Sequence, residues 1–156
     1  RRHTLVAVES EQALRVVAPS TVDAAFYASA TGRMLLALLP AADLRAVVDE
    51  IGPPDAEWPE ARPSGALRRR LDVIRSEGAV VLHRTAAHTI ALAVPLAPPG
   101  AAPAAALGCY YPAARSHAGR EEAVLSAMRD AAEAVALHFE AACAPPPRRE
   151  SGTRTP

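Results

Sequence analysis

The sequence predicts a single α+β domain in which helices pack on an antiparallel sheet. Three observations support this prediction. Runs rich in β-branched residues stand near the start and again in the second half of the chain, three stretches with helical periodicity lie together between them, and a long amphipathic stretch follows. The 156 residues, half of them hydrophobic, suffice for one domain with a core but not comfortably for two.

The first expected elements are a β-hairpin and two short helices. Residues 4–9 (TLVAVE) and 13–18 (ALRVVA) are strand-like runs separated by a polar stretch. A helix follows over residues 29–39, because Ser29 is a favourable cap and the chain reaches Pro40 at its end. Residues 41–51 form a second helix, which Gly52 ends.

A proline-rich loop then leads to a third helix, for which Ser64 is the expected cap and Gly78 the expected end. After it the hydrophobic period changes from helical to strand-like. Three strands and a final helix are predicted at residues 79–84, 89–96, 104–111 (after a turn at 97–103) and 119–142. We expect helices on one face of the sheet, and a partner, loops or a ligand on the other. The final helix packs on its own sheet or, alternatively, on another copy of the chain.

Composition narrows the possible functions. The 17 basic residues balance 17 acidic ones, which argues against a surface that grips nucleic-acid phosphates. No apolar run is long enough to span a membrane, and no signal-peptide pattern is present. Two cysteines are too few for a disulfide framework, so we expect a cytoplasmic protein.

Neither catalysis nor metal binding is expected. His83, His88 and Cys109 lie on or beside neighbouring predicted strands, but the chain contains no CxxC, HxxxH or HExxH spacing. There is no nucleophile elbow, and no pair of carboxylates in a credible cleft. We therefore predict no enzyme activity, no catalytic residue, no metal and no cofactor.

One helix start raises a question. Ala30, Thr31 and Gly32 occupy the first turn of the helix after Ser29, although glycine is a poor helix former. Small residues there would let a ligand approach the backbone, where free N–H groups can bind an anion or a carbonyl oxygen. Alternatively, Gly32 only lets the helix pack closely on a strand.

Three blocks, in this order, resemble the C-terminal effector-binding domain of IclR-type bacterial transcription regulators. They are YASATGRMLLALLP at residues 27–40, LRRRLDVIRSEGAVV at 67–81, and TIALAVPL with AALGCYYPAAR at 89–96 and 105–115. The resemblance covers roughly residues 5–142. It implies a GAF-like fold with a curved antiparallel sheet, and a small-molecule pocket between the concave face of the sheet and the elements above it.

The resemblance also implies a domain organisation. Residues 1–142 would be the effector-binding domain and residues 143–156 a disordered tail. A winged helix-turn-helix domain would precede this chain and is absent from it. The full protein would bind operator DNA through that domain, as a homodimer or homotetramer, and an effector would modulate binding. A GAF-like sensory domain of another kind of signalling protein remains the alternative.

The residues that correspond to the family's pocket come from the helix start and from three strands. The resemblance assigns the effector site to Ala30, Thr31, Gly32, Leu82, His83, Thr89, Ala91, Gly108 and Tyr110.

This sequence departs from the family pattern in two ways. The acidic residues after the strand that follows Gly78 are replaced by HRTAAHT, with His88 near the usual glycine, and the serine-like positions of the last strand are Gly108 and Tyr110. A more apolar pocket, and an aromatic or largely apolar effector, are therefore expected.

Overall fold

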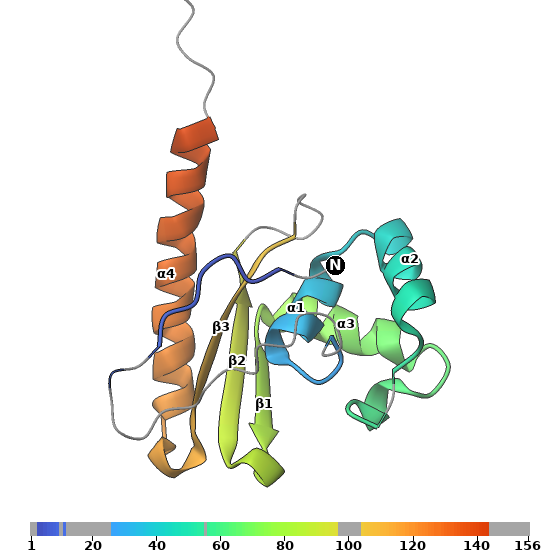
Figure 1. Ribbon diagram of the computed structural model, residues 1–156, viewed down its shortest axis with the longest axis horizontal. Helices are drawn as coiled ribbons and strands as arrows, with labels where there is room; N and C mark the ends of the chain where they lie inside the picture. Colours follow the sequence, from blue (N-terminus) through green and yellow to red (C-terminus); the bar gives the residue numbers. More distant parts are fainter. Residues whose placement is uncertain (1–2, 10, 12–25, 55, 97–103, 144–156) are drawn as a thin grey trace, which may run out of the picture.

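The computed structural model describes residues 3–9, 11, 26–54, 56–96 and 104–143. Within them the fold is α+β, as predicted, with an antiparallel sheet and helices packed on it (Figure 1). The helices and strands are α1 (Ala30–Leu38), α2 (Ala41–Ile51), α3 (Ala66–Glu77), β1 (Val80–Arg84), β2 (Thr89–Pro95), β3 (Ala106–Pro112) and α4 (Arg120–Cys143). Short 3-10 turns lie at η1 (Pro59–Ala61), η2 (Thr85–Ala87) and η3 (Ala113–Arg115).

The three described strands form an antiparallel sheet in the order β1-β2-β3. Ala91 in the centre of β2 lies opposite Leu82 of β1 and Tyr110 of β3. Successive side chains of a strand alternate between the two faces, so this register determines which residues share a face. β1 is thus an edge strand of the described sheet.

Helices cover both faces of the sheet, so the expectation of helices on one face only is wrong. α1 and α3 pack on one face, α4 packs on the other, and α2 lies outside α1 (Figure 1). The reason is the pattern of β2, in which Ile90, Leu92 and Val94 face α4 while Ala91 and Ala93 face α1. A strand that is apolar on both faces must be buried on both.

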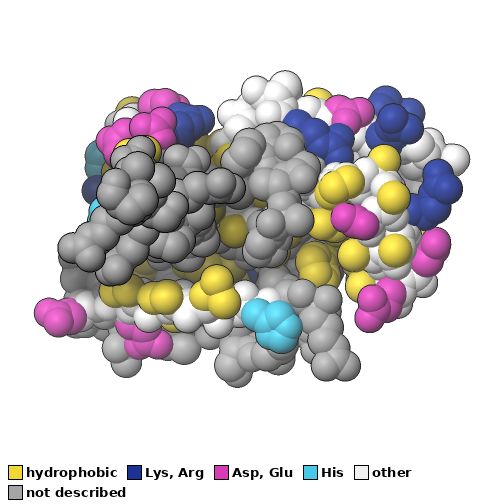
Figure 2. Space-filling view, turned by 90° about the horizontal axis from the view of Figure 1, so that it is seen from above, with side chains coloured by type: hydrophobic (Ala, Val, Ile, Leu, Met, Phe, Trp, Pro, Cys, Tyr) yellow, Lys and Arg dark blue, Asp and Glu magenta, His cyan; other side chains and the backbone are white. Residues whose placement is uncertain are grey.

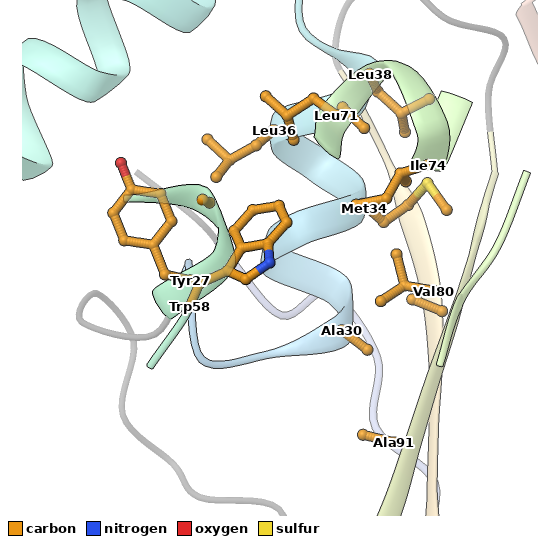
Figure 3. Packing of buried hydrophobic residues seen from close by; sticks show 13 residues of the cluster. Tyr27, Ala30, Met34, Leu36, Leu38, Trp58, Leu71, Ile74, Val80 and Ala91 are labelled. Atoms are coloured by element: carbon orange, nitrogen blue, oxygen red, sulfur yellow. The ribbon is translucent and has the colours of Figure 1, made fainter. Parts of the chain in front are cut away.

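The core between α1, α3 and the sheet contains Met34, Leu71, Ile74 and Val80, and Figure 3 shows Met34 of α1 beside Val80 of β1. These side chains are removed from water almost completely. Burying each of the larger ones is worth about 1.5–3 kcal/mol relative to leaving it exposed. This apolar layer therefore holds α1 against the sheet and determines the position of its first turn.

Local signals place most helix ends where the sequence predicts them. The hydroxyl of Ser29 accepts a hydrogen bond of 3.0 Å from the Gly32 backbone N–H, and the chain leaves helical geometry at Leu39 before Pro40. The predicted cap of α3 is wrong by one residue. The N-cap position is Gly65, in a left-handed conformation that glycine adopts without a Cβ penalty, and glycine has no side chain with which to cap the helix.

The N-terminal hairpin is not formed as predicted. Residues 3–9 are described but are not a strand, and Leu5, Val6 and Val8 are 84%, 80% and 92% exposed. Within the described residues no neighbouring strand pairs with this segment, and β propensity alone does not hold a strand in place. The expected second strand (13–18), the turn at 97–103 and residues 144–156 of the expected tail lie outside the described residues. Cys143, the first residue of that tail, is in α4.

The β1–β2 connection contains a residue under backbone strain. His88 follows η2 with φ 49°, in the left-handed region. A non-glycine residue there costs about 1–2 kcal/mol. The backbone conformation of His88 is therefore one that glycine adopts easily, and glycine is the residue that the family pattern has near this position.

Candidate functional site

The start of α1 lies over the sheet face on which most of the predicted site residues stand. Leu82, Ala91 and Tyr110 are cross-strand neighbours on that face, and each packs with α1 in one apolar cluster. Figure 3 shows Ala30, in the first turn of α1, next to the strand residue Ala91. By strand alternation Thr89 and Gly108 share the same face. The structure thus brings together Ala30, Thr31, Gly32, Leu82, Thr89, Ala91, Gly108 and Tyr110.

His83 does not belong to this group. It follows Leu82 on β1, so its side chain faces the opposite side of the sheet. There its Nε2 lies 3.4 Å from Oε2 of Glu121, in the first turn of α4. The two adjacent residues of β1 that the resemblance assigns to the effector site, Leu82 and His83, therefore face opposite sides of the sheet.

The first turn of α1 is packed tightly. A Cβ added to Gly108 would overlap the Cγ2 methyl of Thr31, so α1 approaches β3 at a distance that only glycine permits. A Cβ added to Gly32 would collide with the backbone carbonyl of Phe26 and lie 2.6 Å from its Cα. Gly32 is thus needed for close packing, but against the turn before the helix rather than against a strand.

A cleft of about 560 Å³ lies between the start of α1 and the end of β1. It reaches from Ala28 and Arg33, at the start of α1, past η1 to α3 and to the end of β1. Of the nine predicted residues, only Leu82 and His83 line it. The complete lining is Ala28, Arg33, Glu57, Trp58, Pro59, Glu60, Arg70, Val81, Leu82, His83, Arg84, Thr85, Ala86 and Ala87.

A second, smaller hollow of about 170 Å³ lies at the β1–β2 connection. Thr89 is on its wall together with His88 and with His83 and Arg84, which also line the larger cleft. Three predicted residues, Leu82, His83 and Thr89, therefore border hollows. The other six do not line either of these two.

The larger cleft is charged, whereas the sequence predicts a mainly apolar pocket. Its ionic side chains are three arginines and two glutamates, which come from α1, the η1 segment, α3 and β1 and are far apart in the sequence: Arg33, Glu57, Glu60, Arg70 and Arg84. Sequence reasoning missed them because each looks like an ordinary surface charge by itself. The one available signal was the single tryptophan, Trp58, within a proline-rich loop.

Three contacts hold Arg33 in place on the wall of this cleft. Its Nε donates a 2.7 Å hydrogen bond to the Tyr27 carbonyl, its Nη2 donates one of 2.8 Å to the Glu57 carbonyl, and its guanidinium lies 4.3 Å from the centre of the Trp58 ring. Burial, more than any neighbouring charge, lowers the pKa of Arg33 to about 10. The group therefore still carries its charge at neutral pH.

Arg84 reaches toward α1 from the end of β1. Its Nη1 donates a 3.1 Å hydrogen bond to the carbonyl of Ala28, just before the cap of α1. One further arginine, Arg70 of α3, is exposed at the rim and has no ion-pair partner among the residues that the structure describes. Three cationic groups thus surround one hollow.

Cys109 packs on the α4 side of the sheet and does not line the cleft. Burial raises the pKa of the Cys109 thiol, so at neutral pH it stays protonated, the form that is a poor nucleophile. Across the described part of the chain, no three histidine, cysteine or acidic side chains meet in a way that could hold a metal ion. No described helix is long and apolar enough to cross a membrane. On the face that Figure 2 presents, basic and acidic side chains are intermixed, without a broad basic surface.

Comparison with known proteins identifies the fold. Residues 4–137 match the family described as bacterial transcriptional regulator IclR C-terminal. The fold is similar to that of a transcriptional regulator from Rhodococcus sp. RHA1, at 22% identity and a TM-score of 0.67 over 85% of this chain and 55% of that one. No curated protein is significantly similar in sequence.

Two further solved structures represent single domains. The C-terminal domain of the Escherichia coli transcriptional regulator KdgR is 19% identical, with a TM-score of 0.58 over 73% of this chain and 70% of that one. The inducer-binding domain of the transcription factor PobR from Acinetobacter, a double mutant in complex with 3-hydroxybenzoic acid, is 23% identical, with a TM-score of 0.55 over 71% and 65%.

This chain aligns with only part of the length of the longer regulators. This chain spans about half of the length of the Rhodococcus protein and of an IclR transcriptional regulator from Alicyclobacillus acidocaldarius, of which it covers 55% and 52%. The family match, in contrast, includes α1 to β3 and most of α4. The chain therefore belongs to the family of IclR C-terminal domains of bacterial transcriptional regulators, which have a GAF-like fold.

Proposed function

We propose that this chain is the effector-sensing domain of an IclR-type transcriptional regulator. A small molecule binds in the cleft beside the start of α1, and this binding modulates the operator affinity of a DNA-binding domain elsewhere in the protein. The observation that carries the proposal is the family match over residues 4–137. The cleft of about 560 Å³ supports it, because ligand pockets commonly measure about 300–1,000 Å³.

The proposed effector is an aromatic or largely apolar small molecule. The cleft has apolar side chains along β1 and η2, among them Leu82 and Ala86. The PobR domain, which has this fold, is a complex with an aromatic acid. The predicted residues that do not line the cleft, in the first turn of α1 and on β2 and β3, act by holding α1 over the sheet and would sense its displacement.

Coupling to DNA binding requires two states with different effector affinity. Thr31 packs closely on Gly108 beneath the first turn of α1, so an effector in the cleft acts on the cap region of α1 through Ala28 and Arg33. A shift of α1 relative to β3 is the proposed switch. It would change the arrangement of the copies in a homodimer or homotetramer and thereby the spacing of their DNA-binding domains.

The test is a thermal-shift screen of this chain against aromatic acids, their neutral amides and small aliphatic keto acids. A ligand at about 100 times its dissociation constant stabilises the folded state by about 2.7 kcal/mol, which corresponds to a rise in Tm of about 5–10 °C. We expect at least one aromatic compound to produce such a rise. Stabilisation only by small hydrophilic acids would contradict the proposed effector class, and no stabilisation by any compound would contradict the sensor function.

A further inference from the structure

We propose that the beginning of α3 is a DNA-contact surface, where four arginines bind phosphates of the duplex to which the regulator binds. We call this surface the arginine end of α3, and it consists of Arg62, Arg68, Arg69 and Arg70. The inference goes beyond effector sensing and rests on the proposed function only in taking DNA to be within reach of this domain. The balanced charge of the whole chain does not reveal this surface, because its excess of positive charge is local.

The first argument is the local excess of positive charge. Residues 62–70 contain four arginines and no acidic residue, and all four arginines are exposed. Among the residues that the structure describes, none of the four has an ion-pair partner. Farther along α3, in contrast, Arg75 is paired with Asp72. Like charges that lie together without counter-charges repel one another, and a bound polyanion relieves that repulsion.

The second argument is the position of these charges on the helix. Arg68 lies in the first turn of α3, which contains no acidic residue. The start of a helix has a partial positive charge, so acidic side chains stabilise it and basic ones do not. The guanidinium of Arg69 folds back over this start, with Nη1 3.3 Å from the position of a Cβ added to Gly65. These charges therefore do not stabilise α3, which favours a role in binding over a role in stability.

The third argument selects the kind of partner. Residues 62–70 expose no large apolar side chain, because Ala66 is buried and Leu67 packs against the core. Protein–protein interfaces have an apolar or aromatic centre, whereas protein–DNA interfaces are polar and strongly positive. The guanidinium fork matches two oxygens of one phosphate. A DNA backbone therefore fits the arginine end of α3 better than an acidic protein segment does.

The arginine end of α3 is also separate from the other exposed features of the domain. α3 begins at the side of the domain that is remote from α4 (Figure 1). Contact with DNA there leaves free the exposed apolar side chains of α4, Val135 and Leu137. Arg70 is shared with the cleft, so the test relies on Arg68 and Arg69, which do not line it.

Fluorescence anisotropy measures binding of this chain to a labelled DNA duplex of arbitrary sequence and about 20 base pairs, over about 25–200 mM salt. The variants are Arg68→Gln, Arg69→Gln, the corresponding double variant and Arg68→Glu. Arg45→Gln is the matched control, because it removes the same charge from an exposed position of α2. A poly-glutamate peptide is the competing polyanion, and circular dichroism melts verify that each variant is folded.

We expect the association constant to fall steeply with salt, with a slope of log K against log salt of about −3 to −4 for four phosphate contacts. Arg68→Gln and Arg69→Gln should each weaken binding a few-fold and make the slope shallower by about 1, for any DNA sequence. Arg68→Glu should weaken binding more than Arg68→Gln and yet raise the Tm, because glutamate is favourable in the first turn of a helix. Arg45→Gln should leave the slope unchanged.

Three results would overturn the inference: no binding at the lowest salt concentration, an unchanged slope in the double variant, or poly-glutamate that displaces DNA at an equal concentration of charges. The last result would assign the surface to an acidic protein segment instead. None of these results bears on the sensor function, because the thermal-shift screen contains no DNA. Failure of that screen, in turn, would leave the measured DNA contact unchanged.

Discussion

At the residue scale, two glycines determine how α1 sits on the sheet. Gly108 lets the methyl group of Thr31 contact the backbone of β3, and Gly32 lets the turn at Phe26 fold back against the helix. Neither has a positive φ, so their role is the absence of a side chain and not backbone freedom. The small residues at the helix start thus create a close contact, and none of them lines the cleft.

We predict that Gly108→Ala destabilises the fold by about 1–3 kcal/mol, because the added methyl overpacks the contact with Thr31. Urea denaturation at neutral pH measures the change in the free energy of unfolding. Thr31→Ser removes the methyl that is in the way, and the double variant should recover most of the loss. An equal cost of Gly108→Ala with and without the Thr31→Ser substitution would show that this contact is not the cause.

At the scale of elements, the first half of α4 packs on the sheet, whereas its second half, the projecting half, extends beyond the ends of the strands (Figure 1). Leu125, Met128 and Ala132 are buried against the sheet, while Val135 and Leu137 are 39% and 66% exposed. Figure 1 shows α4 continuing past the end of the strands. Both halves of α4 have apolar residues at helical spacing. The first half is buried and the second is exposed because the sheet is shorter than the helix.

We predict that Met128→Ala lowers the free energy of unfolding by about 2–5 kcal/mol, because it leaves a cavity between α4 and β2. Val135→Ala, on the same helix, should change it by less than about 1 kcal/mol. Chemical denaturation of the isolated chain compares the two. A large loss for Val135→Ala would mean that the projecting half is covered, for example by another copy of the chain.

The elements themselves are largely predictable from the sequence. Ser29, Gly52 and Gly78 stand at the helix ends that they predict, and the strands begin and end within two residues of the expected positions. These signals are local, so they do not depend on the rest of the fold. The strand expected at residues 4–9 fails because pairing requires a distant partner, and β propensity cannot supply one.

At the scale of the whole molecule, the structure leaves groups of apolar side chains exposed in residues 3–9 and on the projecting half of α4, whereas Val73 of α3 is exposed singly. These groups include Leu5, Val6, Val8 and Leu137. Exposed apolar residues in such groups favour association with another surface. We therefore expect copies of this chain to associate through them.

Sedimentation equilibrium over a range of concentrations tests this expectation. We predict a dimer or tetramer, with Leu137→Glu shifting the equilibrium toward the monomer because it places a charge on the projecting half of α4. Arg68→Gln, on an exposed face of α3, serves as a control that should leave the mass unchanged. If the chain remains monomeric at high concentration, self-association is not part of the function of the domain.

The sequence by itself determined the fold class, most of the helix ends, the three antiparallel strands and the family, because these depend on hydrophobic period, capping residues and the order of short blocks. Only the tertiary structure decided which face each side chain occupies, that helices cover both faces of the sheet, and that Thr31 contacts Gly108. It also brought Arg33, Arg70 and Arg84 to one cleft. The physical reason is distance along the chain: local signals shape each element, but the charge and shape of a cleft arise where elements far apart in the sequence pack together.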